Sequence, residues 1–425
     1  MSRYQRYPAY KNSGVEWIGE IPEHWEVKQA RHVFRIFSGS TPKSGEELFW
    51  DGDITWFTPE DLGNNQQKNI SASRRKITED GYKSCGTSLA KANSLVLSTR
   101  APIGHIALST VSACCNQGCR ILEPENSCSG YWYYTLLSAK PALQCLGQGS
   151  TFMELPRPSL ASFKLPYPPL EEQQAIASFL DLKTAQIDDL IAKKEELLKK
   201  LDEKRTALIT QAVTKGLDQS GPMKNSGVAW IGEIPRHWEV KRLKQTMLLI
   251  TNKSCAETQN VALENIESWS GKYIPSDTEF EGDGVTFQVG DILFGKLRPY
   301  LAKAYLAEFP GAAVGDFHVM RPVKTILHGR YTLFLILNHG VISIVDGSTF
   351  GAKMPRVSWD FMGNLQVPVP PLKEQQAVAE HIANGIVKIA RQKAQVIDAI
   401  ERLKEYRITL IANFITGKYC VSHKS

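Results

Sequence analysis

The sequence predicts an α+β protein in which two mixed α/β regions alternate with two long helices. The first observation behind this prediction is a duplicated order of segments: residues 11–28 (KNSGVEWIGEIPEHWEVK) return almost unchanged as residues 224–241 (KNSGVAWIGEIPRHWEVK). The second is a pair of long amphipathic stretches, residues 168–216 and 370–418, which open with PPLEEQQ and PPLKEQQ. The chain therefore runs leader, variable region, helix, and then repeats that order.

Each leader concentrates apolar residues in a short irregular segment. These residues are Trp17, Ile18, Pro22 and Trp25 in the first copy, and Trp230, Ile231, Pro235 and Trp238 in the second. Because apolar rings need burial, we expect the leader to pack on its neighbouring domain or on the base of a helix. The alternative is a patch on which a partner protein docks.

The variable regions, residues 29–167 and 242–369, predict mixed α/β domains with many short strands. Strands are expected at residues 53–57, 94–98, 104–108, 285–289, 291–294 and 312–314, and short buried helices at 131–138 and 331–337. Two further echoes link the regions: NSLVLSTRAPIG with GDILFGKLRPYL, and GSTFMELPRPSL with GSTFGAKMPRVSW, the latter with one extra residue. Otherwise the two regions differ, so one scaffold is expected to carry two different surfaces.

Both long stretches place apolar residues at alternating spacings of three and four, which forms one stripe on a helix. The Pro-Pro pair excludes an earlier start, and glutamate in the first turn suits the helix dipole. A narrow stripe kept for about 45 residues needs a partner, and the chain supplies one equivalent helix. The alternative is two unrelated surface helices.

Asn384-Gly385 interrupts the second helix at a cost of about 1 kcal/mol relative to alanine. This interruption predicts a kink or a close approach of the first helix.

The composition is that of a globular protein with a formal net charge of +6, which permits a polyanionic partner without requiring one. The first residues have no apolar core, so no signal peptide is expected. No apolar run is long enough to span a membrane, and the eight cysteines contain no CxxC pair. We therefore expect a cytoplasmic protein with reduced thiols.

The sequence contains no recognisable catalytic motif. It has no GxxxxGK[ST] phosphate loop, no GxGxxG after a strand and no HExxH. The Pro-Pro pairs open helices, unlike the Asp/Asn-Pro-Pro-Tyr/Phe motif of adenine methyltransferases. Cys114, Cys115, Cys119 and Cys128 do not fit zinc spacings, so buried or loose thiols are the preferred interpretation over a metal site. We therefore expect that the chain is not an enzyme.

Basic and hydroxyl side chains in loops form the candidate binding surface. Arg100 follows one predicted strand, and Lys296 and Arg298 follow another, where scaffolds commonly display functional groups. Arginine and lysine bond guanine edges or phosphates, and small hydroxyls suit phosphates. For any single residue the alternative is a solvated charge or a turn hydroxyl. The full set is Ser40, Thr41, Lys43, Arg74, Arg75, Arg100, Ser150, Thr151, Arg157, Lys296, Arg298, Tyr300, Ser348, Thr349, Lys353 and Arg356.

With these residues in view, the chain resembles the specificity subunit of a Type I restriction–modification system. The resemblance rests on the two leaders, on GDILFGKLRPYL, on GSTF followed by Pro-Arg, and on PPLEEQQ and PPLKEQQ at the start of the long helices. The resemblance implies two target-recognition domains, related by a pseudo-twofold axis and separated by an antiparallel coiled coil. The segments would be a leader with the first recognition domain (1–167), the first spacer helix (168–216), a leader with the second recognition domain (217–369), the second spacer helix (370–418) and a tail (419–425).

The resemblance also implies the partners. Double-stranded DNA would be read as an asymmetric bipartite target with an unread gap set by the helices. Two methyltransferase subunits would dock on the coiled coil and leaders, and restriction subunits would join through them. This chain would carry no cofactor, because S-adenosylmethionine, ATP and magnesium belong to the partner subunits. Two other hypotheses remain: a protein–protein adaptor with two peptide-binding domains, and a nuclease with an unrecognised active site.

Overall fold

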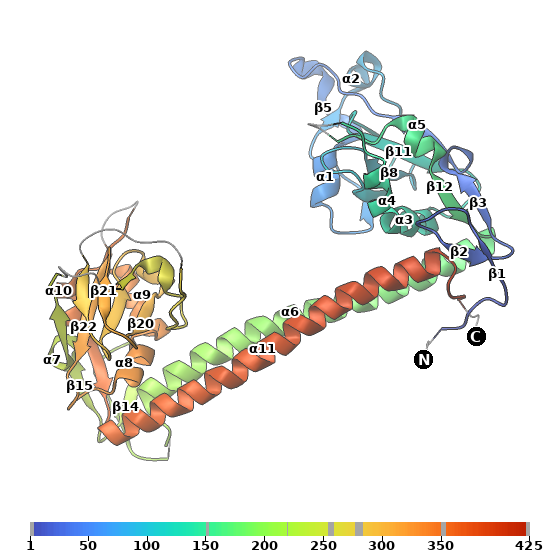
Figure 1. Cartoon of the computed structure of the whole chain (residues 1–425). Coiled ribbons are helices and arrows are strands. Elements are labelled where there is room, and N and C mark those ends of the chain that lie inside the picture. Colours follow the sequence, from blue (N-terminus) through green and yellow to red (C-terminus); the bar gives the residue numbers. More distant parts are fainter. Residues whose placement is uncertain are drawn as a thin grey trace. The chain divides into compact units, whose positions relative to one another are not determined.

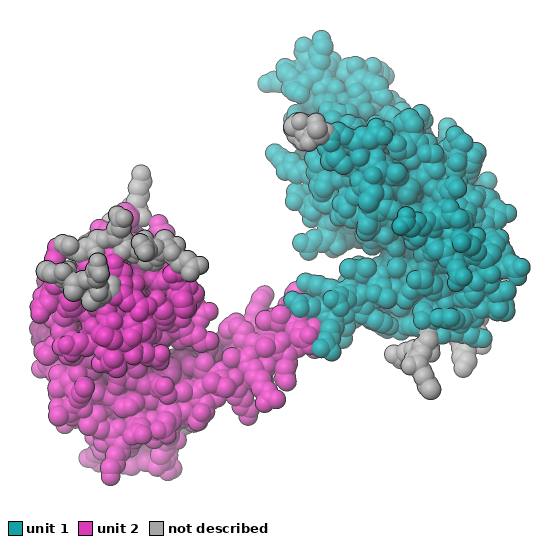
Figure 2. All heavy atoms as spheres, viewed as in Figure 1, with its two compact units in different colours: residues 1–193, 399–425 teal, residues 194–398 magenta. Residues whose placement is uncertain are grey.

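The computed structural model describes residues 4–149, 153–218, 220–253, 259–276, 284–349 and 354–421. The chain divides into two compact units: unit 1 comprises residues 1–193 and 399–425, and unit 2 comprises residues 194–398 (Figure 2). Each unit holds one leader, one variable region and a part of both long helices. The boundary between the units thus falls inside the helices, and the finer segmentation expected from the sequence stays a prediction.

The variable region of unit 1 is built on a five-stranded sheet in the order β4-β11-β8-β9-β6. Its central strand β8 (Leu95–Ser98) is buried along its whole length. Leu95 and Leu97 pack into one hydrophobic cluster and Val96 into another, as the alternation of a strand requires. The remaining strands are β4 (Phe34–Ser38), β11 (Cys119–Pro124), β9 (Ile106–Ser109) and β6 (Asn69–Ile70), with a second sheet of β10 (Ala113–Cys115), β5 (Trp50–Phe57) and β7 (Lys76–Ile77).

Short helices cover the unit 1 sheet. One of them, α3 (Ser129–Ser138), packs on β8 and β9 and buries Tyr131 and Trp132. Thr58 and Thr78 cap the first turns of two others through their hydroxyl oxygens. The others are η1 (Ala30–His32), η2 (Glu47–Phe49), α1 (Pro59–Asn64), α2 (Glu79–Ser84), α4 (Lys140–Cys145) and α5 (Arg157–Ser162).

Within its described residues, unit 2 repeats this plan with one strand fewer in its main sheet, whose order is β16-β22-β19-β20. These strands are β16 (Met247–Ile250), β22 (Phe317–Pro322), β19 (Ile292–Gly295) and β20 (Ala304–Leu306). A second sheet contains β17 (Asn260–Val261), β21 (Gly311–Ala313) and β18 (Val285–Phe287). The helices are α7 (Leu243–Thr246), η3 (Leu263–Asn265), η4 (Pro299–Leu301), α8 (Gly329–Ile336), α9 (His339–Gly347) and α10 (Trp359–Gly363).

The elements predicted from the sequence are present with shifted ends. The six predicted strands appear as β5, β8, β9, β18, β19 and β21, and the two short buried helices as α3 and α8. The mixed α/β character expected of both variable regions is therefore confirmed.

The leaders form small strands at the base of each unit. In unit 1 they are β1 (Tyr10–Asn12), β2 (Glu20–Pro22) and β3 (Glu26–Gln29), the last paired with β12 (Lys164–Tyr167). In unit 2 they are β13 (Met223–Asn225), β14 (Glu233–Pro235) and β15 (Glu239–Arg242), the last paired with β23 (Gln366–Val369). Trp25 and Trp238 are buried, which confirms that the leaders pack on their own domains and helices.

The two long helices are α6 (Leu170–Lys215) and α11 (Leu372–Ile415) (Figure 1). They pair antiparallel within each unit. In unit 1 Arg407 Nε lies 2.9 Å from Asp188 Oδ1, and the rings of Phe179 and Phe414 are 4.5 Å apart. In unit 2 Lys393 Nζ lies 2.7 Å from Asp202 Oδ1. The pairing that the apolar stripes predict is therefore confirmed.

Asn384-Gly385 does not break α11, which is helical throughout. A Cβ at Gly385 would overlap Leu208 of α6, so the glycine allows the first helix to approach closely. The sequence predicts either a kink or a close approach of the first helix at this point, and the structure shows the close approach. Both helices are followed by a glycine with positive φ, Gly216 at 71° and Gly417 at 72°, a common way to end a helix.

Candidate nucleic-acid interface

The turn that follows β8 in unit 1 is held by a short backbone frame. The Thr99 N–H donates to the Gly118 carbonyl, and the Leu155 N–H donates to the Thr99 carbonyl, both at 2.8 Å. Ala101 follows with a φ of 53°. A side chain in this left-handed region costs about 1–2 kcal/mol. Residues with such backbone strain cluster at functional sites.

The turn that follows β19 in unit 2 has the same frame. The Lys296 N–H donates to the Asp316 carbonyl at 2.8 Å, and the Val357 N–H donates to the Lys296 carbonyl at 3.0 Å. Arg298 has a φ of 51° and precedes a proline, as Ala101 does in unit 1. The hydrogen bonds therefore make Lys296 the counterpart of Thr99, and Asp316 the counterpart of Gly118.

Three charged side chains meet on this frame in unit 1, and we call them the unit 1 cluster: Arg100, Arg120 and Glu154. Glu154 Oε2 lies 3.8 Å from Arg100 Nη1, and its Oε1 lies 3.9 Å from Arg120 Nη2. Arg120 is largely buried and donates from Nη1 to the carbonyls of Gln117 and Cys119. One carboxylate is thus shared by a fixed cation and a more exposed one.

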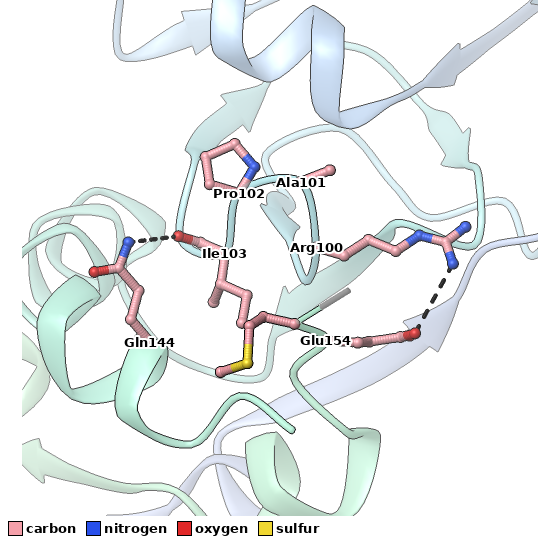
Figure 3. A pocket seen from close by; sticks show the side chains of 7 residues that line it. Arg100, Ala101, Pro102, Ile103, Gln144 and Glu154 are labelled. Carbon is pink, nitrogen blue, oxygen red and sulfur yellow. Dashed lines mark hydrogen bonds and ion pairs between the residues drawn. The ribbon is translucent and has the colours of Figure 1, made fainter. Parts of the chain in front are cut away.

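A cavity of about 760 Å³ opens beside the unit 1 cluster. Figure 3 shows Arg100 and Glu154 on one side and Gln144 on the other, with Ile103 between them. Met153 also lines the cavity. Gln144 Nε2 donates to the Ile103 carbonyl at 3.2 Å and fixes that wall. The cavity therefore combines an apolar lining with charged groups at its edge, a combination that suits base edges and the thymine methyl group.

The corresponding group in unit 2, which we call the unit 2 cluster, consists of Lys296, Asp316 and Arg356. Arg356 Nη2 lies 2.8 Å from Asp316 Oδ2, and Lys296 Nζ lies 3.7 Å from Asp316 Oδ1. Arg356 is paired with Leu297 in a β-bridge, just as Glu154 is paired with Arg100. The counterpart of Glu154 is therefore Arg356, and the carboxylate has changed position within the frame.

The structure corrects the alignment of the two Pro-Arg pairs. Pro156 is the N-cap of α5 and Arg157 its first residue, whereas Arg356 stands two residues before Ser358, the N-cap of α10. Arg157 and Arg356 therefore occupy different places although the sequence echo aligns them. The frame positions residues by cross-strand hydrogen bonds. A difference in length of the preceding loop therefore shifts the sequence alignment of the two Pro-Arg pairs away from the structural one.

The other predicted residues of unit 1 are distributed around this site. Thr41 lies beside the unit 1 cluster, because its hydroxyl donates to Gln117 Oε1. Ser40 and Lys43 use their carbonyls to accept from buried tryptophan indoles. Three arginines interact within the unit: Arg74 pairs with Glu60, Arg75 lies over the Trp50 ring and Arg157 donates weakly to the Ile36 carbonyl.

The other predicted residues of unit 2 fall into two groups. Arg298 and Tyr300 are exposed on the turn after β19, beside the unit 2 cluster. Ser348 and Thr349 instead donate their hydroxyls to carbonyls of the last turn of α9, at 2.7 and 2.8 Å. The negative end of a helix dipole disfavours phosphate there. Ser150, Thr151 and Lys353 lie outside the described residues.

The family model for the Type I restriction modification DNA specificity domain matches residues 22–200 and 235–402. Each match begins in a leader and ends within a long helix. The chain belongs to this family. Among its relatives, the Type I restriction enzyme MjaIX specificity subunit of Methanocaldococcus jannaschii is 34% identical over 422 residues, covering 94% of this chain and 95% of the relative.

Another specificity subunit and two solved structures are also similar to this chain. The EcoDI specificity subunit of Escherichia coli is 24% identical, covering 94% of this chain and 90% of the relative. The fold is shared with a chain from a structure describing complex assembly and conformational transition of the Type I R-M system, with TM-score 0.68, 14% identity, and coverage of 93% of this chain and 98% of that chain. The HsdS subunit of Thermoanaerobacter tengcongensis gives TM-score 0.59, 14% identity, and coverage of 94% and 98%.

The described ranges of this specificity subunit contain no group of three or more His, Cys, Asp or Glu side chains placed to hold a metal. Cys114, Cys115 and Cys119 are buried, and burial raises the pKa of the Cys114 thiol to about 12. Burial lowers the pKa of His318, whose Nε2 lies 3.0 Å from the Val357 carbonyl beneath the unit 2 cluster. In the described part of the chain no helix is long and apolar enough to cross a membrane.

Sequence reasoning missed Arg120, Glu154, Asp316 and His318. The two carboxylates carry no positive charge, so a search for DNA-binding residues passes over them. The signal that could have found Asp316 is its place directly before β22, opposite the end of β19. Glu154 has no such signal, because its position depends on the bridge to Arg100.

Proposed function

We propose that this specificity subunit reads an asymmetric bipartite DNA target, with one half-site read by each unit. The observation that carries the proposal is the pair of clusters: the same backbone frame presents different charged side chains in the two units. Different side chains on one frame are what two different half-sites require. The net charge of +6 is compatible with a polyanionic partner.

The long helices are proposed to set the unread gap between the half-sites. Helix α6 has 46 residues, which at 1.5 Å per residue is about 69 Å. That length exceeds one turn of DNA, about 34 Å. Changing the helix length should therefore change the gap and leave both half-sites unaltered.

The partners proposed are modification subunits that dock on the long helices and leaders, with restriction subunits joining through them. Exposed apolar side chains on the helices support this: Leu182, Leu190 and Ile408 in unit 1, and Leu197, Val387 and Ile397 in unit 2. The chain itself is proposed to be non-catalytic and cytoplasmic. S-adenosylmethionine, ATP and magnesium would act in the partner subunits.

Methylation mapping tests the proposal. Genomic DNA from cells that express this chain with its modification subunit should carry a methylated, bipartite, gapped motif. Replacing residues 29–167 by another recognition region should change one half of that motif only. A single uninterrupted motif would refute the two-domain arrangement. Absence of any motif, together with peptide binding that salt barely weakens, would favour the adaptor hypothesis, because DNA affinity falls steeply with salt.

A further inference from the structure

Each cluster contains two cations and one carboxylate, but the carboxylate stands on a different segment of the frame in each unit. In unit 1 it is Glu154, on the bridging segment before α5; in unit 2 it is Asp316, in the turn before β22. We propose that Glu154 and Asp316 are the specificity-determining carboxylates of the two half-sites. Each accepts a hydrogen bond from an exocyclic amino group of cytosine or adenine. This inference rests on the proposed DNA-reading function and names the residues that carry it.

A carboxylate between two cations fits a base edge better than a phosphate. Phosphate oxygens are repelled by a carboxylate, whereas the amino groups of cytosine N4 and adenine N6 in the major groove donate to one. A cation alone would be sufficient for backbone positioning. The presence of a carboxylate in both clusters, on the same frame but at different positions, therefore points to base reading and to different bases.

The unit 1 carboxylate is available to accept. Its two oxygens are 3.8 and 3.9 Å from the arginine nitrogens, beyond hydrogen-bond length, and the described residues supply no side-chain hydrogen bond to them. The Glu154 side chain is 41% exposed. The cations beside it are positioned in advance: Arg120 by two backbone carbonyls, and Arg100 by its passage over Gly118, where a Cβ would lie 3.1 Å from Nε.

The unit 2 carboxylate is arranged differently. Oδ2 of Asp316 accepts from Arg356 at 2.8 Å, while Oδ1 lies 3.7 Å from Lys296 Nζ and keeps room for one donor. Asp316 occupies the position that glycine holds in unit 1, so it faces the frame from the other side. The two units are therefore expected to read their bases from opposite sides of the frame.

The test uses the chain assembled with its modification subunits and a DNA library randomised over the two half-sites. Bound DNA is sequenced after equilibrium selection, first with the unaltered complex and then with Glu154→Gln and Asp316→Asn, which keep shape and remove charge. We expect Glu154→Gln to change discrimination at one base pair of one half-site by about 5- to 150-fold, the range of a good base contact, because an amide bonds adenine N6 and N7 whereas a carboxylate accepts from cytosine N4. Asp316→Asn should do the same in the other half-site only, so each variant is the control for the other.

The outcomes are distinct. Unchanged discrimination at every position in both variants overturns the inference, and so does an equal loss of affinity for all sequences, which indicates a phosphate-proximal role. If the unaltered complex enriches no sequence, the proposed function itself fails. Should Glu154→Gln fail to assemble, Glu154→Asp replaces it: the carboxylate is kept but withdrawn by one methylene, and altered discrimination at that one base pair is again required.

Discussion

Glu172, in the first turn of α6, accepts hydrogen bonds from two leader side chains and from Tyr7 just before the leader. Its removal tests how the leader is held. The donors are Trp25 Nε1 at 3.0 Å, Tyr7 OH at 2.8 Å and His24 Nε2 at 2.6 Å. Trp25 is fully buried, so Glu172→Ala leaves its N–H without a partner, at a cost of about 1–3 kcal/mol. His24 is half exposed and Tyr7 only partly buried, so these two bonds add about 1 kcal/mol together. We therefore expect the leader to be held less tightly by about 2–4 kcal/mol.

Native-state hydrogen exchange at the amides of β3 measures this loss directly. A loss of about 2–4 kcal/mol corresponds to exchange that is roughly 30 to 1000 times faster. Glu171→Ala is the matched control, because its side chain is exposed. Glu172→Gln, which keeps one acceptor oxygen, should fall between the two. If the β3 amides exchange at the same rate in Glu172→Ala and in Glu171→Ala, the Glu172 carboxylate does not hold the leader.

Three further predictions concern DNA and pH. Replacing Lys296 and Arg298 together by alanine should weaken DNA binding and lower the salt slope by up to about 2, measured by affinity against salt concentration; an unchanged slope removes both from the interface. Inserting seven residues into each long helix adds about 10 Å, so the mapped gap should widen by about three base pairs while both half-sites persist. Burial lowers the pKa of His318, so its contribution to stability is present above about pH 6.5 and lost as pH falls through its lowered pKa. His318→Gln should therefore flatten the acid side of a melting-temperature profile, and an unaltered profile contradicts this role.

The fold was largely predictable because its determinants are local or duplicated. The apolar stripes of α6 and α11 are visible as spacing, and the leaders are visible as near-identical repeats. The close approach at Gly385 could be anticipated as one of two options, because a glycine inside a helix needs a reason. What decided between them was the position of Leu208, which no local pattern contains.

The candidate site was less predictable because it depends on cross-strand register. Aligning Pro102 with Pro299 correctly makes Thr99 the counterpart of Lys296, since both lie in a continuous strand and turn. The segment that faces this turn across the β-bridge is not continuous with it in the chain. Aligning the Pro-Arg pairs of that segment matches Arg157 with Arg356, which the structure places at different positions. Arg75 shows the opposite failure: it looks like a free basic side chain in the sequence, yet it lies over the Trp50 ring at 3.6 Å.

The two units reach the same packing through different connectivity. In unit 2 the leader follows α6 in the chain, and a Cβ on Gly216 would lie 3.0 Å from the Trp238 ring. In unit 1 Trp25 makes the same contact with Gly417, which is distant in sequence, and Tyr10 OH donates to the Lys418 carbonyl at 3.0 Å. The contact between helix end and leader is thus required by packing rather than by chain order. Because that contact and the backbone frame are independent of the charged clusters, the side chains of the clusters can differ between the units without changing the fold.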